Sequence, residues 1–413
     1  MDNATTLAGP LSGITVLDLS RALAGPYATS MLADMGAHVI KVEGINGGDS
    51  SRSWPPFENQ HSLYFDSVNR NKSSVALDFY SVEGKELLRT LAAQADVLIE
   101  NFRPGVLATI GLDPQILRAT NPGLVVASVS GFGTEGPLAA TAGLDQVAQG
   151  MSGLMSVTGA DAQNMYRFGV PIIDMSAGMV IAFGIASALT QRATTGVGID
   201  VSTSLLETAL SLSAFQGQRY LSNGELPVPQ GNDHPVLAPY GVFRTRDIQI
   251  IIAVGNDKQF GQLAQVVGDP ALVGDPQYAT GRERSLNREA LAAHLETLLA
   301  TKPGLDWLDD LRAAKIPCGP IHNFAQVFAD PQVKAVDMVR NLQRSDGSEL
   351  PLLRGPLSIN GSPTPVSKAP PALGEDTRNV LEGLGLDTEQ IDGLIAAGIV
   401  NQAAIPVVEA AGR

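Results

Sequence analysis

The first 130 residues alternate between short apolar runs and amphipathic segments, and no other feature of the sequence constrains the fold as strongly. Apolar runs that are typical of buried strands occupy residues 13–19, 38–43, 74–79, 96–100 and 124–130. Helical segments separate some of them, at residues 27–35 and 81–93. Because parallel strands are joined by crossovers that are usually helices, this alternation predicts an α/β fold whose parallel sheet is covered by helices on both faces.

Proline-rich stretches divide the remaining chain. Residues 223–239 carry prolines and few helix formers, which is typical of a linker or an active-site loop. Residues 240–340 follow with a predicted hairpin, turned at Arg246 and Asp247, and several short helices, as in a smaller α+β domain. We therefore predict a large domain that begins with residues 1–222, a small domain at 240–340, and an extended segment with two helices at 341–413.

Charge and composition exclude several classes of protein. The chain has 28 Lys and Arg against 42 Asp and Glu, a net charge of −14, which disfavours binding to nucleic acid or to anionic membranes. Its single cysteine and five histidines show no metal-ligand spacing, so we expect no metal site. Residues 175–190 are uncharged but short for a membrane span, and the N-terminus lacks the pattern of a signal peptide. We expect a cytoplasmic protein.

The turn after the first strand excludes a common type of cofactor site. Its sequence, SRALAGP, has one glycine, whereas a dinucleotide fingerprint needs Gly-x-Gly-x-x-Gly at this place. The chain also lacks a Walker A motif and a Gly-x-Ser-x-Gly elbow. A nicotinamide-dependent dehydrogenase is therefore disfavoured.

Seven segments in a fixed order, spread over residues 11–400, point to one family. They are VLDLSRALAGPYATSMLADMGAHVIKVE, NRNKSSVALD, ADVLIENFRPGVL, NPGLVVASVSGFG, GVPIIDMSAGM, QGNDHPVLAPYGVF and APPALGEDTRNVLEGLG. Together they resemble the family III CoA-transferases of the CaiB/BaiF type. The resemblance implies a Rossmann-like large domain built from both chain ends, a smaller inserted domain and an interlocked homodimer. It also implies that the substrates are an acyl-CoA and a small carboxylic acid, with no permanently bound cofactor.

The same resemblance implies that Asp174 is the catalytic nucleophile. In this family a carboxylate attacks the thioester, and CoA passes through an aspartyl anhydride and an aspartyl-CoA thioester. An alternative from the residues alone is that Asp174 caps the helix that follows it, because Asp is a favoured N-cap. The two roles are compatible, since a helix N-terminus also favours an ionised carboxylate.

Further site residues are implied by alignment with the family. The CoA cleft is expected to be lined by Ala24, Leu77, Asp78, Phe79, Tyr80, Asn101, Phe102 and Arg103. Ordinary packing at strand ends is the alternative for all of this group except Arg103. The basic candidates for the CoA phosphates are Arg52, Arg70, Lys72 and Arg103, each of which could instead be a solvated surface charge.

A substrate loop is implied at Gly231, Asn232, Asp233 and His234. Formyl-CoA transferases carry a run of glycines there, so this loop is expected to be stiffer and more polar. His234 is a candidate to hydrogen-bond an acceptor carboxylate, with a solvated loop histidine as the alternative.

Departures from the best-known members narrow the substrate. Leu23, Gly44 and Thr109 replace a glutamine and two arginines of formyl-CoA transferases, which argues against oxalate or formate as substrates. The GNDHP loop, which lacks the glycine run, resembles that of members that use dicarboxylates such as succinate. Alpha-methylacyl-CoA racemases are the catalytic alternative, but they carry Gly-His-Asp where this chain has Gly143, Leu144 and Asp145. Leucine cannot transfer a proton, so this chain lacks one of the two bases that a racemase needs. A non-catalytic CoA-binding protein of the same fold is the remaining alternative.

Overall fold

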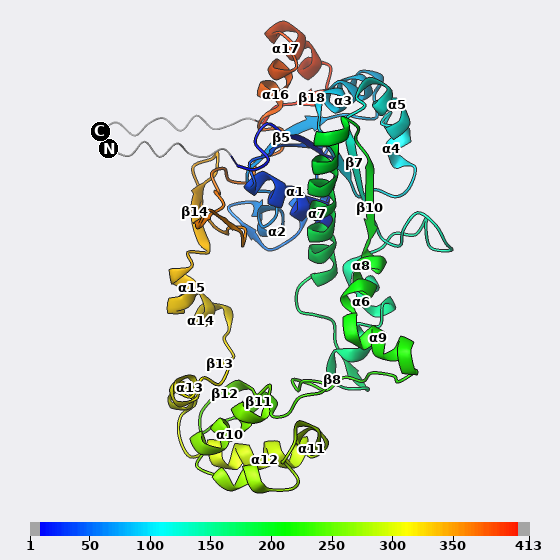
Figure 1. Ribbon diagram of the computed structural model, residues 1–413. Coiled ribbons are helices and arrows are strands. Elements are labelled where there is room, and N and C mark those ends of the chain that lie inside the picture. The colour runs from blue at the N-terminus through cyan, green and yellow to red at the C-terminus, as the bar shows by residue number, and fades with distance from the viewer. Residues whose placement is uncertain (1–8, 404–413) are drawn as a thin grey trace, which may run out of the picture. The chain divides into compact units, whose positions relative to one another are not determined.

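The computed structural model describes residues 9–403, which divide into two compact units. The large unit contains the described residues up to Leu154, then Phe168–Gln218, and the chain from Asp337 onward. The small unit contains Met155–Arg167 and Arg219–Val336. Figure 1 shows the elements of both units.

One segment lies in a different unit from the one we predicted. Residues 155–167, which we assigned to the large domain, form η2 (Met155–Val157) and the short hairpin of β8 (Gly159–Asp161) and β9 (Asn164–Met165) in the small unit. The Gly231 N–H donates to the Gly159 carbonyl at 2.9 Å, so the hairpin is tied to the chain that follows residue 219. This contact is remote in sequence, and local patterns cannot reveal it.

The large unit is built on a sheet with the strand order β10-β7-β6-β1-β2-β5-β18. Six of these strands are parallel to their neighbours, and only the short β18 (Val400–Asn401) pairs antiparallel, with β5. The parallel strands are β1 (Thr15–Asp18), β2 (His38–Glu43), β5 (Lys72–Leu77), β6 (Val97–Glu100), β7 (Val125–Ser130) and β10 (Asp200–Ser204). The predicted parallel sheet is confirmed.

Helices cover both faces of this sheet. Successive residues of a strand point to opposite faces, so Val16 packs into one core and Leu17 into the other. The first core lies under α1 (Ala24–Asp34), α7 (Ile172–Thr195) and α8 (Leu205–Leu212). The second lies under α3 (Val82–Gln94), α5 (Pro114–Thr120), α16 (Thr377–Gly383) and α17 (Thr388–Ala396).

Helix α7 is the longest element and positions the site described below. By length and composition it is the one helix in the described residues that could cross a membrane, but half of its most apolar stretch is buried within the large unit. It crosses α1 closely at Gly178, where an added Cβ would lie 2.7 Å from the Ala24 carbonyl oxygen. Glycine at this position allows the two helices to pack without a clash.

The remaining elements of the large unit are short, and several were not expected from the sequence. An excursion after β2 contains η1 (Ser50–Ser53), β3 (Phe57–Glu58), β4 (His61–Ser62) and α2 (Leu63–Asp66). The returning chain forms two hairpins, β14 (Val339–Gln343) with β15 (Glu349–Leu353) and β16 (Ser358–Ile359) with β17 (Ser362–Pro363). The others are α4 (Val106–Thr109), α6 (Asp145–Met151) and the start of α9 (Ala214–Asn223).

The small unit has its own core around a three-stranded antiparallel sheet of order β11-β12-β13. The predicted hairpin is formed by β11 (Tyr240–Arg244) and β12 (Gln249–Ala253), and β13 (Cys318–Pro320) adds the third strand. Helices α10 (Asp257–Val266), α12 (Arg288–Leu299) and α13 (Gly304–Ala313) supply most of the buried side chains. The other elements are η3 (Pro270–Gly274), α11 (Gly281–Leu286), α14 (Phe324–Ala329) and α15 (Pro331–Ala335).

Candidate active site

Asp174 is the third residue of α7, and it does not cap this helix. The N-cap position is Pro171, which has no side-chain cap of its own. The cap is supplied from elsewhere in the chain: Asp145 Oδ1 accepts from the N–H groups of Ile173 at 2.8 Å and of Asp174 at 3.2 Å. The alternative in which Asp174 serves as the N-cap is therefore wrong, and its own carboxylate is left free of that task.

Asp145 is itself firmly held. It lies in the first turn of α6 and is buried. Its Oδ2 accepts from Gln149 Nε2 at 2.5 Å, and Gln149 Oε1 accepts from the Phe168 N–H at 2.8 Å. These bonds connect α6 to the segment that leads into α7, so that segment and the first turn of α7 are both held in place by α6.

The Asp174 carboxyl group makes no hydrogen bond or ion pair with any other part of the described chain. It is partly buried, and burial together with the negative charge of Asp145 raises its pKa to about 7. The N-terminal end of α7 acts in the opposite direction, because its partial positive charge favours the carboxylate. An unpaired carboxyl group with such a pKa exchanges readily between its two protonation states near neutral pH, and only the ionised state is a nucleophile.

Tyr64 is a neighbour of this pair that sequence reasoning missed. The pKa of its phenol is raised by burial first, and then by the negative charges of Asp174 and Asp145. Its ring packs edge-on against Trp54, with centroids 5.0 Å apart. Tyr64 comes from α2 in the excursion after β2, where neither periodicity nor a motif distinguishes it from other aromatic residues.

The contact between α1 and α7 indicates which way Asp174 faces. Residues four apart lie on one face of a helix, so Asp174 shares a face with Gly178, which touches the first residue of α1. That first residue is Ala24, one of the predicted CoA-cleft residues, and its side chain is buried. Asp174 therefore lies on the face of α7 that packs against α1, the helix that follows the turn after β1.

Two other predicted cleft residues meet at that turn. Asn101 Oδ1 accepts from the Arg21 N–H, and Asn101 Nδ2 donates to the Arg21 carbonyl, both at 2.8 Å. The Phe102 ring centroid lies 5.2 Å from the Arg21 guanidinium carbon. Both polar atoms of the Asn101 side chain therefore bind the backbone of the turn. Arg21, which we had not predicted as a site residue, lies beside two predicted ones.

The run from Leu77 to Tyr80 separates into buried and exposed residues. Leu77 and Phe79 belong to the core under α3, so only their backbone remains for a ligand. Asp78 Oδ1 accepts from the Tyr80 N–H at 3.1 Å, and the Tyr80 side chain is 65% exposed. Of this run, Asp78 and Tyr80 keep side chains that a ligand can reach.

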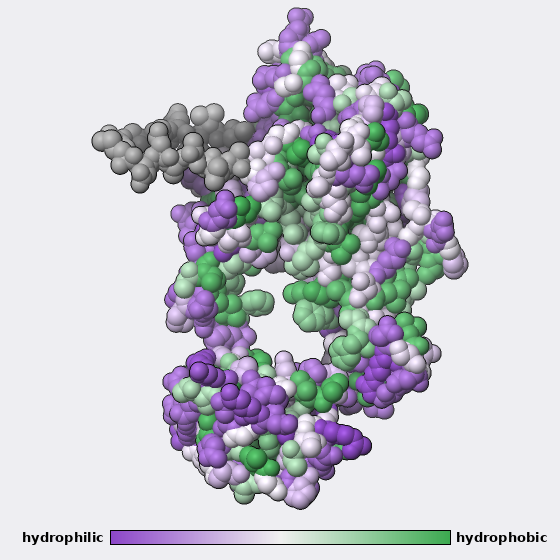
Figure 2. All heavy atoms as spheres, in the orientation of Figure 1, coloured by the Kyte–Doolittle hydropathy of each residue, from purple (hydrophilic) through white to green (hydrophobic). Residues whose placement is uncertain are grey.

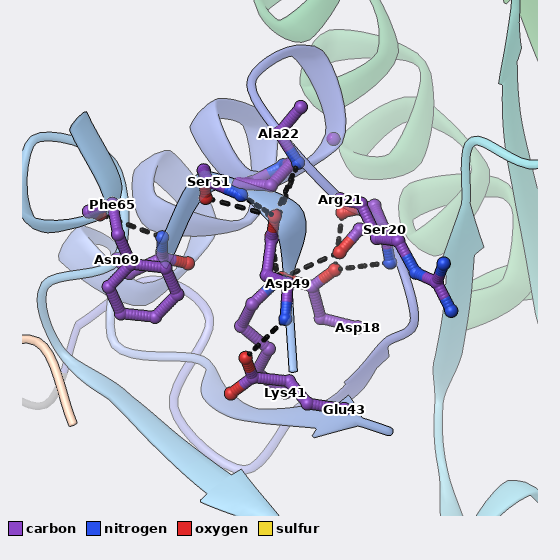
Figure 3. Close-up of polar contacts among 12 residues, drawn as sticks. Asp18, Ser20, Arg21, Ala22, Lys41, Glu43, Asp49, Ser51, Phe65 and Asn69 are labelled. Atoms are coloured by element: carbon purple, nitrogen blue, oxygen red, sulfur yellow. Dashed lines mark hydrogen bonds and ion pairs between the residues drawn. The ribbon is translucent and has the colours of Figure 1, made fainter. Parts of the chain in front are cut away.

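The structure contradicts the assignment of Arg70 and Lys72 as contacts for CoA phosphates. The Lys72 ammonium is fully buried 3.1 Å from Asp18 Oδ2, and burial lowers its pKa to about 8. Arg70 is also buried and forms an ion pair with Asp34. Arg52 is largely buried and forms an ion pair with Glu43. Figure 3 shows Glu43 beside Lys41 and Asp49. Arg103 is the one member of this group that is exposed.

The predicted substrate loop lies in the small unit. Gly231 adopts a left-handed conformation with φ of 60°, which glycine allows without strain. His234 Nδ1 accepts from the N–H groups of Val236 at 3.1 Å and Leu237 at 3.0 Å, and its ring packs on Tyr240. His234 therefore organises its own loop, and only its Nε2–H is left to reach a ligand.

Comparison with known proteins supplies the context for this geometry. The model of a family described as CoA-transferase family III matches residues 11–377. A succinate–glutarate CoA-transferase of Agrobacterium fabrum is 40% identical over 382 residues, 91% of this chain and 96% of that protein. An acetyl-CoA:oxalate CoA-transferase of Acetobacter aceti is 37% identical over 86% of this chain and 91% of its own. The crystal structure of a CAIB/BAIF family protein from Brucella suis superposes with a TM-score of 0.81 at 39% identity, and covers 91% of this chain and 100% of that one.

Proposed function

The chain belongs to CoA-transferase family III, and on that premise we propose that it transfers CoA between dicarboxylic acids with Asp174 as the nucleophile. The observation that carries the proposal is the unpaired Asp174 carboxyl at the start of α7, with its backbone N–H bound by Asp145. Covalent catalysis by a carboxylate needs a free oxygen in a fixed position, and the site supplies both. The similar enzymes from Agrobacterium fabrum and Acetobacter aceti are named for succinate, glutarate and oxalate, which are all dicarboxylates.

The proposed reaction begins with acylation of the carboxylate. An oxygen of ionised Asp174 attacks the thioester carbonyl of succinyl-CoA, and the CoA thiolate leaves, which gives a mixed anhydride of Asp174 and succinate. The thiolate then attacks the aspartyl carbonyl of the anhydride. Succinate is released, and CoA is held as a thioester on Asp174.

The second half repeats these steps in reverse order with the acceptor. A carboxylate of the acceptor acid attacks the aspartyl thioester, expels the thiolate and forms a second anhydride. The thiolate attacks the acceptor carbonyl, so the new acyl-CoA leaves and the Asp174 carboxylate is regenerated. Every step exchanges one activated acyl bond for another, so no hydrolysis and no outside energy source are required.

Among dicarboxylates we propose that the acids are of succinate and glutarate length. Leu23, Gly44 and Thr109 stand where formyl-CoA transferases have a glutamine and two arginines, and these differences argue against oxalate as a substrate. CoA and its acyl esters are then substrates, and no resident cofactor is needed for the chemistry.

We also propose that the protein is a homodimer that buries part of α7. Phe183 is 75% exposed on this helix, next to the exposed side chains of Met179 and Val180. Figure 2 shows apolar and weakly polar surface along α7. Exposed apolar patches of this kind on a well-packed helix are typical of protein interfaces.

The test is direct. Purified protein is incubated with succinyl-CoA in deuterated water and with glutarate, oxalate or butyrate, and the new CoA esters are identified by mass spectrometry. Glutaryl-CoA should form fastest, and Asp174→Ala should form none while it retains its circular dichroism spectrum. A 2-methylacyl-CoA under the same conditions should take up no deuterium, because Leu144 cannot act as a base. Transfer by Asp174→Ala, or rapid deuterium uptake, would contradict the proposal.

A further inference from the structure

The turn between β1 and α1 is held by charged and amide side chains that are almost all buried. Its residues are Ser20, Arg21 and Ala22, at the carboxyl end of β1. Ligands of open parallel sheets bind at this edge, so the rigidity of the turn bears on ligand binding there. Figure 3 shows the cluster that holds it.

The turn is held first by the ion pair of Lys41 and Asp49, in which both side chains are fully buried and 3.0 Å apart. Lys41 Nζ donates to the Ser20 carbonyl at 2.7 Å. Both Asp49 oxygens accept from the Ala22 N–H, at 3.0 and 3.1 Å, which supports the positive φ of 63° at Ala22. Two buried charges thus fix the backbone on either side of Arg21.

Asn101 fixes Arg21 itself. It accepts from the Arg21 N–H and donates to the Arg21 carbonyl, so both backbone groups of this residue are satisfied by one amide. A buried ionic cluster that serves only stability is often no better than an apolar core. This cluster also has a specific structural effect, because it fixes the backbone position of one residue, Arg21.

The Arg21 side chain is free to act. It extends away from the cluster in Figure 3, is partly exposed, and rests with its guanidinium on the Phe102 ring. Within the described residues it forms no ion pair, whereas Lys41, Lys72, Arg52 and Arg70 each pair with a carboxylate. An unpaired arginine in a rigid turn at a ligand-binding edge is well placed to bind an anion from outside, in a chain whose net charge is −14.

From these observations we infer that Arg21 is a specificity-determining residue that binds an anionic group of the substrates. This inference rests on the proposed function of Asp174. A guanidinium matches a carboxylate or a phosphate by two parallel hydrogen bonds, so the group is either the distal carboxylate of the dicarboxylic acid or a phosphate of CoA. Asn101 is then a positioning residue for Arg21 rather than a direct contact for CoA.

The experiment compares Arg21→Gln and Arg21→Lys with the parent enzyme. The matched control is Arg89→Gln, which removes the same charge from an exposed pair with Glu86 on α3. Three quantities are measured: kcat/KM for glutarate, kcat/KM for butyrate, and the Kd of free CoA by calorimetry. Loss of a hydrogen bond to a charged group lowers affinity by about tenfold to a hundredfold.

The two sources of the anion give different patterns. If Arg21 binds the distal carboxylate, Arg21→Gln lowers kcat/KM for glutarate by about tenfold or more and leaves butyrate and CoA binding unchanged. If it binds a CoA phosphate, the Kd of CoA rises by a similar factor and both acids are affected equally. Arg21→Lys should recover part of either loss, because it restores the charge without the two-pronged geometry.

A double-mutant cycle tests the positioning role. Asn101→Ala should produce the same pattern as Arg21→Gln, and adding Arg21→Gln to Asn101→Ala should cost little more. The inference is overturned if Arg21→Gln matches Arg89→Gln in all three measurements. The calorimetric Kd needs no turnover, so a phosphate contact remains measurable even if the proposed transfer reaction is absent, and the two failures are distinguishable.

Discussion

The replacement Asp145→Asn tests whether the charge of Asp145 sets the working pH of Asp174. Asp145 is in the first turn of α6 and binds the N-terminal end of α7, where the pKa of Asp174 is raised to about 7 by burial and by the charge of Asp145. Asparagine removes the charge but keeps an oxygen that can accept from the Ile173 and Asp174 N–H groups, since Asn and Asp are equally good caps. The variant therefore removes the charge and keeps the helix cap, while its Nδ2 can no longer accept from Gln149 Nε2 as Oδ2 does.

The size of the effect follows from Coulomb's law. Two unit charges roughly 6 Å apart at an effective dielectric constant of about 20 repel by about 2.8 kcal/mol, equivalent to about two pH units. This value is an upper bound, because burial is the larger cause of the raised pKa. We therefore expect the loss of the Asp145 charge to lower the pKa of Asp174 by about one pH unit. Because the nucleophile is the ionised form, kcat/KM rises with pH through this pKa, and the midpoint should move from about pH 7 to about pH 6.

The assay is the pH dependence of kcat/KM for succinyl-CoA with glutarate as acceptor, with each profile scaled to its own plateau. At pH 6 the scaled value should be about fivefold higher in Asp145→Asn than in the parent. Asp113→Asn is the control, because Asp113 caps α5 on the opposite face of the sheet with a 2.8 Å bond to the Gln115 N–H. An unchanged or higher midpoint in Asp145→Asn would refute this account of the site.

Three further predictions concern a loop, a buried pair and a surface. His234→Ala should slow transfer to dicarboxylates and to butyrate alike, because the loop backbone loses its acceptor. His234→Asn restores an acceptor and should recover most of the rate, whereas loss of rate in both variants would indicate that Nε2 contacts the substrate. Arg70→Gln should lower the free energy of unfolding by about 3–5 kcal/mol, because it leaves the buried Asp34 carboxylate without its ion-pair partner, and the KM for succinyl-CoA should stay unchanged. A raised KM in a variant that remains stable would indicate that Arg70 contacts a CoA phosphate after all. Phe183→Asp should halve the mass measured by light scattering, and a mass equal to that of the parent would exclude α7 from the interface.

The sequence predicted the central sheet well because its strands are buried on both faces. The run at residues 124–130, for example, is uncharged and mostly apolar, and the structure forms β7 over Val125–Ser130. The hairpin of β14 and β15 was missed, although Asp346 and Gly347 between the strands are a recognised turn signal. Alternating burial is weak in β14, so the turn alone would have had to identify this hairpin.

The site was predictable only where a single residue carries the function. Asp174 was identified from its motif. Asp145, which caps its helix, is 29 positions away, and no local sequence pattern predicts the contact. The same limit applies to the basic residues. Lys72 and Arg70 were plausible phosphate contacts until the fold placed them on Asp18 and Asp34, at sequence separations of 54 and 36.

The central claim, that Asp174 forms a covalent bond with CoA, is tested most directly by trapping the intermediate. The protein is mixed with succinyl-CoA in the absence of an acceptor, quenched in acid and digested with trypsin, which should release residues 168–192 as one peptide. We predict that this peptide carries CoA on Asp174 and that hydroxylamine removes it, as expected for a thioester. A peptide that stays unmodified, while a parallel sample of the same protein given glutarate turns over at its normal rate, would contradict the proposed mechanism. An adduct on any other residue would contradict it as well.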